Sequence, residues 1–84
     1  MSEINIHSLN GTTDRDNDAK VIGMIENNSD IHLDLEVEVT FYRNNNFIGH
    51  GSTWVEVPPG RSRPFEVNEY DCPMTNFEVS VFSR

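Results

Sequence analysis

The sequence predicts an all-β domain, an antiparallel β-sandwich of about seven strands. Apolar and polar residues alternate strictly along 31–43, and turn-forming residues recur at the spacing of short strands. No segment of useful length has the periodicity of a helix. Eighty-four residues suffice for one hydrophobic core, so we expect 1–84 to be a single domain.

The alternation in IHLDLEVEVTFYR (31–43) predicts one long strand with a buried face and a solvated face. Its buried face would hold six apolar side chains, those of Ile31, Leu33, Leu35, Val37, Val39 and Phe41. Asparagine clusters flank this strand, NNSD at 27–30 and NNN at 44–46. Asparagine tolerates left-handed backbone, so each cluster predicts a tight connection between neighbouring antiparallel strands.

Two further strands are predicted before the long one. The first covers 3–9, and the second covers 19–27, which is apolar on both sides of Gly23 and is typical of a central strand. After the NNN cluster, 47–57 predicts a strand that begins with a bulge or bend. Two glycines indicate this bulge, Gly49 and Gly51.

The end of the chain predicts an edge strand and a final strand. The PPG sequence at 58–60 fixes a turn. Residues 61–67 should form an edge strand, because Pro64 has no amide proton for a central ladder. The last strand, 76–82, directs three apolar side chains inward, those of Phe77, Val79 and Val81.

The order of these features resembles the FxLYD domain family. The similarity covers 21–82 and lies in the segments VIGMIENNSD, VEVTFYRNNNFIG and WVEVPPGRSRPFEV. The matching residues are Gly23, Asn27, Phe41, Tyr42, Gly49, Pro59, Gly60 and Phe65. The chain departs from the family pattern at Arg43, where aspartate is usual, at the hairpin tip, which lacks glycine, and at Pro58, where leucine is usual.

This resemblance implies an immunoglobulin-like β-sandwich, commonly attached to secreted or surface proteins of archaea and bacteria, with no established catalytic site. A second resemblance is to the water-stress and late-embryogenesis type of sandwich domain, which shares the long alternating strand and the G-x-G after the hairpin. The FxLYD resemblance rests on turn and core residues and carries almost nothing about activity.

The charge balance favours a cationic partner. Fourteen acidic residues against six basic ones give a net charge of -8, which repels phosphate backbones and excludes a nucleic-acid binder. Acid excess with a single lysine, Lys20, is typical of proteins that work in strong salt, so a halophilic source is a hypothesis. We expect a monomer without a cofactor.

Cysteine content and hydropathy bear on localisation. One cysteine, Cys72, cannot form an internal disulfide. The chain has no apolar run long enough to span a bilayer and no signal-like pattern in 1–20, so membrane insertion is not expected. We expect an intracellular protein if the chain is complete, and a secreted or surface domain if it is part of a longer one.

Alternate carboxylates in the polar run 11–20 raise the question of a calcium site, at Asp14, Asp16 and Asp18. The helical calcium loop requires a glycine after the third carboxylate and a terminal glutamate, where this chain has Ala19 and Ile25. Two interpretations of this aspartate run remain, a less regular calcium-binding loop and a solvated turn. The solvated turn is the leading interpretation.

Another acidic row lies on the wet face of the long strand, at Asp34, Glu36 and Glu38. It predicts either a surface for a cationic partner or an ordinary wet face neutralised by Arg61 or Arg63 on neighbouring strands. Trp54 is out of phase with Val55 and Val57, and so faces away from the core. It is either an interface contact or a cover for the sheet margin.

Catalytic residues are not expected. The histidines, His7, His32 and His50, and the single cysteine lie far apart in the sequence with no spacing typical of a zinc or nucleophilic site. Asn10 and Asn27 match the N-glycosylation pattern, which matters only in a secreted protein. Three functions follow as alternatives: a non-catalytic interaction or spacer module, a calcium- or salt-stabilised binding domain, and a small acidic inhibitor protein.

Overall fold

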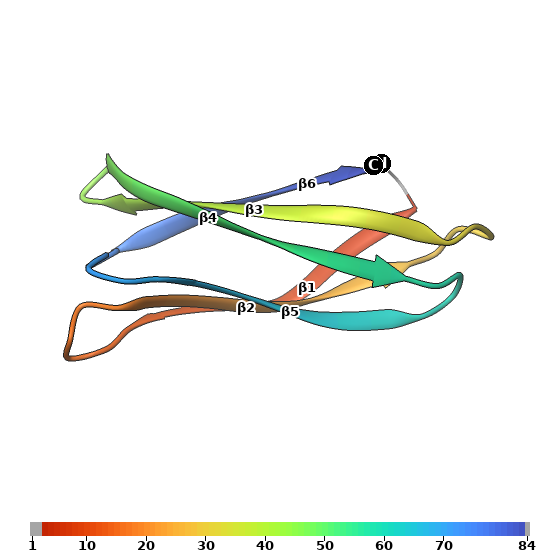
Figure 1. Cartoon of the computed structure of the whole chain (residues 1–84), viewed down its shortest axis with the longest axis horizontal. Coiled ribbons are helices and arrows are strands. Elements are labelled where there is room, and N and C mark those ends of the chain that lie inside the picture. Colours follow the sequence, from red (N-terminus) through yellow and green to blue (C-terminus); the bar gives the residue numbers. More distant parts are fainter. Residues whose placement is uncertain (1–2, 84) are drawn as a thin grey trace.

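A computed structural model of the chain describes residues 3–83, which form two antiparallel sheets of three strands each (Figure 1). The strands are β1 (Ile4–Thr13), β2 (Ala19–Asn27), β3 (Leu33–Arg43), β4 (Asn46–Val57), β5 (Ser62–Glu69) and β6 (Asn76–Ser83). The prediction of an all-β fold is confirmed, but the described residues form six strands rather than about seven. The longer remaining segments, 14–18, 28–32 and 70–75, are turns and irregular chain. Nothing within 3–83 forms a helix that could cross a membrane.

The two sheets lie face to face as separate layers, with strand orders β1-β2-β5 and β4-β3-β6 (Figure 1). The domain is elongated, 41 Å long and 20 Å by 17 Å across. Strands β4 and β5, the edges of their respective sheets, are neighbours across the two layers. One continuous hydrophobic core fills the space between the layers, with buried side chains from β2, β3, β4 and β5.

Strand β3 is the centre of the second sheet and follows the predicted alternation. Five of its inward side chains are buried, those of Leu33, Leu35, Val37, Val39 and Phe41. The sixth predicted core residue, Ile31, lies before the strand and is 60% exposed. That prediction was wrong because the chain at 28–32 is crossing from one sheet to the other.

The connection at 27–30 is therefore not the predicted turn between neighbouring strands, since β2 and β3 belong to different sheets. Asn27 holds this corner and is fully buried. Its Nδ2 donates hydrogen bonds to the carbonyl oxygens of Ile31 (2.8 Å) and Val57 (2.9 Å). Its Oδ1 accepts hydrogen bonds from the amide (2.9 Å) and the hydroxyl (2.6 Å) of Ser29. The glycosylation pattern at Asn27 is consequently inaccessible in the folded protein.

The NNN cluster forms the predicted hairpin between β3 and β4. Asn44 and Asn45 have φ values of 51° and 70°, which a two-residue type I′ turn requires. The predicted bulge is also present, because Phe41 pairs with Gly49 while Tyr42 pairs with Phe47. The residue between them, Ile48, packs against the core.

Strands β2, β5 and β6 agree with their predictions, whereas β1 continues four residues past its predicted end, to Thr13. Strand β2 is central in the first sheet and β5 is an edge that contains Pro64. Gly60, in the turn before β5, has a φ of 71° that favours glycine. The inward side chains of β6 are half-buried against the core, as expected for Phe77, Val79 and Val81.

Candidate functional site

The outward side of the β4-β3-β6 sheet is strongly acidic, and we call it the acidic face. It carries five carboxylates, those of Asp34, Glu36, Glu38, Glu56 and Glu78. The strand register places serine, threonine, tryptophan, phenylalanine or another carboxylate opposite each of them. Among the described residues, no lysine or arginine shares this side of the sheet.

The expectation that Arg61 or Arg63 neutralises the row on β3 is wrong. Arg63 lies on β5 opposite Ile25, and Arg61 immediately precedes β5, so both belong to the first sheet. The reason is the connection at 58–60, which carries the chain from β4 across to the other layer instead of back along the same sheet. Within residues 3–83, the carboxylates of β3 therefore have no lysine or arginine as a cross-strand partner.

Two exposed aromatic side chains flank the middle of the acidic face. Trp54 on β4 and Phe82 on β6 both pair with Glu36 on β3, so the carboxylate lies between them in one row. They are 55% and 51% exposed, respectively. Trp54 thus faces outward as predicted. Phe82 was missed, although its position out of phase with the inward residues of β6 was a sufficient signal.

The hairpin end of the acidic face carries a second aromatic group. Phe47 and His50 on β4 have ring centroids 6.3 Å apart. Next to them, a hydrogen bond to Glu78 and the negative charge of that carboxylate raise the pKa of the Tyr42 hydroxyl, with desolvation adding to the shift.

At the opposite end of the face, three groups converge that are separate in the sequence. The Nε2 atom of His32 lies 3.4 Å from Oδ1 of Asp34 and 3.4 Å from Oε2 of Glu56. Asp34 and Glu56 are direct cross-strand partners, which is why residues 22 positions apart meet. The other histidines lie elsewhere: His7 is on β1, and His50 is near the hairpin.

The aspartate run forms the turn between β1 and β2. Oδ1 of Asp14 accepts hydrogen bonds from the amides of Asp16 (2.8 Å) and Asp18 (3.0 Å). Oδ1 of Asp18 accepts a hydrogen bond from the amide of Asp71 (3.1 Å). Carboxylate oxygens of the three residues still come within 4.8 Å of one another. The structure thus gives the run a role in closing a loop, and the calcium interpretation stays a prediction.

Cys72 is buried in the segment between β5 and β6. Its amide donates a hydrogen bond to the carbonyl of Asn17 (2.6 Å), which ties this segment to the aspartate turn. Burial raises the pKa of the Cys72 thiol, and the nearby Glu69 carboxylate raises it further. The thiol is therefore neutral at ordinary pH, which is the opposite of what a nucleophilic cysteine requires.

Ionisation of Cys72 is expected to lower the stability of the fold in alkali. The native thiol keeps its proton above the ordinary pKa of 9.0 at which the unfolded chain loses it. The protonated thiol therefore contributes to the free energy of unfolding in full below pH 9.0, and this contribution is lost as the pH rises through the pKa of the folded state. Urea unfolding from neutral to alkaline pH should show a steeper loss for the wild type than for Cys72→Ala. Parallel curves would contradict the prediction.

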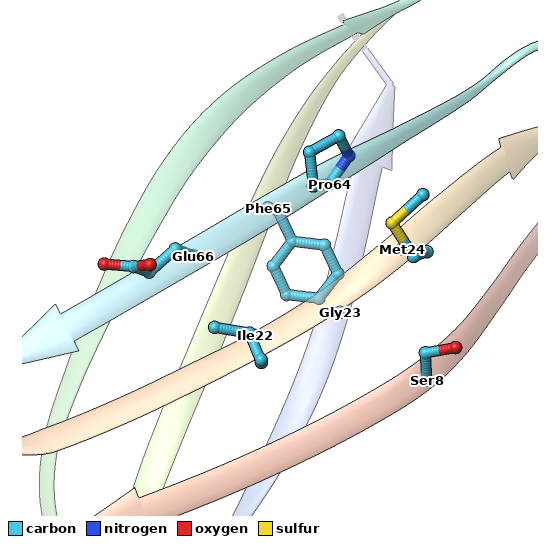
Figure 2. Close-up of a pocket in the computed structure, with 7 residues that line it drawn as sticks. All are labelled: Ser8, Ile22, Gly23, Met24, Pro64, Phe65 and Glu66. Atoms are coloured by element: carbon cyan, nitrogen blue, oxygen red, sulfur yellow. The ribbon is translucent and has the colours of Figure 1, made fainter.

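The outer side of the first sheet has an apolar hollow of about 430 Å³ (Figure 2). Its walls come from all three strands, with Ile22 and Met24 on β2, Pro64 and Glu66 on β5, and Ser8 on β1. The Phe65 ring lies between the β2 and β5 ribbons beside Gly23, where a Cβ atom would come within 2.7 Å of the ring. Nothing in the sequence predicted this hollow, because it depends on which strands are neighbours.

Comparisons of the chain with protein-family models, with curated proteins and with solved structures found no match.

Proposed function

We propose that the chain is a non-catalytic, immunoglobulin-like β-sandwich module of the FxLYD type that binds a cationic protein partner through its acidic face. The observation that carries this proposal is the row in which Trp54 and Phe82 flank Glu36 on a side of the sheet without lysine or arginine in the described residues.

Electrostatics support a cationic partner. Outward residues of one strand lie about 7 Å apart, so the carboxylates of Asp34, Glu36 and Glu38 repel one another along β3. Each is partly or fully accessible to a partner. A row of like charges on one face attracts an oppositely charged protein and increases its association rate.

The aromatic side chains supply the contact area that charge alone lacks. A guanidinium or ammonium group over an aromatic ring gains about 0.5–2 kcal/mol, depending on how far it is desolvated. With Glu36 between Trp54 and Phe82, one arginine or lysine side chain could meet two rings and a carboxylate together. Exposed tryptophans are also enriched among the residues that dominate binding energy at interfaces.

The family part of the proposal rests on residues that define the resemblance. Asn27 ties the corner between the sheets through its four hydrogen bonds. Gly23 and Phe65, which lie in separate family segments, are cross-strand partners, and the ring occupies the space of the missing Cβ. These contacts give a physical reason for the motif residues in a two-layer fold.

A titration with a short oligo-arginine peptide at low ionic strength tests the binding proposal. We expect Trp54→Ala to weaken binding about tenfold, equivalent to about 1.4 kcal/mol, since a cation–aromatic contact is lost. Glu36→Gln should weaken binding comparably. Isothermal titration calorimetry measures the affinities, and amide chemical shifts should map the peptide to β3, β4 and β6.

Matched controls separate the face from overall charge. Glu66→Gln removes the same charge from the first sheet, and Tyr70→Ala removes an aromatic side chain that is 77% exposed outside the acidic face. Both control proteins should bind the peptide as the wild type does. Equal weakening by Glu36→Gln and Glu66→Gln would reduce the interaction to non-specific charge attraction and overturn the proposal.

The acidic inhibitor alternative would use the same face. A row of carboxylates on a rigid strand offers fixed negative charges to a basic, nucleic-acid-binding protein. In that case the partner would be a basic protein whose own nucleic-acid site is blocked, and displacement of its nucleic acid by the chain would distinguish it from a simple interaction module.

A further inference from the structure

We infer that His32, Asp34 and Glu56 form a surface site for a divalent transition metal ion with tetrahedral geometry, of which zinc is the representative. This site lies at one end of the acidic face and does not depend on the proposed protein partner. Its basis is the convergence of an imidazole nitrogen with two carboxylate oxygens from three separate positions of the backbone.

The strand pairing holds the two carboxylates in place. Asp34 and Glu56 face each other across β3 and β4, with their side chains on the same outward side. His32 lies immediately before β3, and its Nε2 atom is near both carboxylates. The three side chains are 50%, 55% and 76% exposed in the order His32, Asp34, Glu56, and an ion can reach them directly from solvent.

The donor set, one imidazole nitrogen with two carboxylate oxygens, fits zinc better than calcium or magnesium. Zinc binds nitrogen and oxygen ligands at about 2.0–2.2 Å, so neighbouring ligand atoms of a tetrahedral site are about 3.3–3.6 Å apart. Both measured separations from Nε2 of His32 are 3.4 Å. Calcium prefers six to eight oxygen ligands, and an imidazole nitrogen is a poor substitute. A water molecule or a group of a partner would complete the fourth position.

The competing explanation is a protonated His32 that bridges two carboxylates as an ion pair without any metal. Such exposed ion pairs contribute about 0–1 kcal/mol and need no further ligand. The two explanations differ in one respect, which is whether a stoichiometric ion binds and changes the imidazole environment.

Titration of the tag-free full chain with zinc chloride tests the site. One equivalent of zinc should bind, and the imidazole resonances of His32 should shift while those of His7 do not. Cobalt(II) in place of zinc should give the intense visible absorption of tetrahedral coordination. We expect each of His32→Ala, Asp34→Asn and Glu56→Gln to weaken zinc binding more than about tenfold, since even groups that only orient a ligand are worth about 10–100-fold.

Controls on the same molecule exclude general charge effects. His50→Ala removes an exposed histidine of the same sheet outside the cluster, and Asp16→Asn removes a carboxylate of the aspartate turn. Both should bind zinc as the wild type does, and circular dichroism should show that all variants are folded. Zinc affinity that is unchanged in His32→Ala, or the absence of saturable binding to the wild type, would overturn the inference.

Discussion

Replacement of Phe41 by alanine is expected to remove most of the free energy that keeps the protein folded. Phe41 is the largest of the completely buried side chains and lies on the central strand of the second sheet. Its strand partners are Gly49 and Phe77, so no large neighbour on β4 can fill the space that it leaves. Removal of a buried phenylalanine costs about 3–5 kcal/mol, and a domain of this size has only about 5 kcal/mol of stability.

Thermal and urea unfolding followed by circular dichroism measure this effect. The matched control is Phe47→Ala, which makes the same chemical change at a side chain that is 61% exposed in the adjacent hairpin. Phe47→Ala should change the free energy of unfolding by less than about 1 kcal/mol. Similar losses in the two variants would mean that the core is not organised around β3 as described.

Asn27→Ala is expected to cost about 2–4 kcal/mol, because buried carbonyl groups lose their hydrogen-bond donor. The side chain amide is the donor to Ile31 and to Val57, and the alanine side chain cannot replace it. Asn27→Asp keeps an oxygen that can accept from Ser29 but loses both donated bonds and buries a charge. At neutral pH, Asn27→Asp should therefore lower the free energy of unfolding more than Asn27→Ala does.

The neighbouring Asn28 provides the control. It is exposed, and its side chain donates only to Glu26 on the surface (3.2 Å). Asn28→Ala should leave the urea midpoint nearly unchanged. If Asn27→Ala were equally harmless, the corner would be held by the backbone bonds of Asn27 to Gly60 and Arg61, and its side chain would be dispensable.

The sequence predicted those parts of the fold that depend on local chemistry. Alternation in β3 identified its buried residues from Leu33 to Phe41, because side chains of a strand must face opposite sides. The left-handed tolerance of asparagine identified the turn at Asn44 and Asn45. Pro64 identified an edge strand because it lacks an amide proton.

The failures share a different physical origin. The residues at 27–30 indicate a change of direction, but they do not specify whether the next strand joins the same sheet. That choice depends on contacts such as the bond from Asn27 to Val57, which is 30 positions away. For the same reason Arg61 and Arg63 were assigned to the wrong sheet.

The candidate site was predictable in part. The outward row on β3 and the outward direction of Trp54 follow from alternation alone. The position of Phe82 beside Glu36, and the meeting of Glu56 with His32, depend on the register between strands. The register between strands is a property of the assembled sheet, and the sequence of an individual strand does not determine it.

The connectivity of the two sheets also has a consequence for the order in which the protein folds. Two pairings, β1 with β2 and β3 with β4, join consecutive strands, whereas Gly23 pairs with Phe65 and Val39 pairs with Val79 across long stretches of chain. Distant pairings must first overcome the entropy of loop closure. We therefore expect the hairpins to form early and β5 and β6 to dock late, with an overall folding time of about milliseconds to seconds.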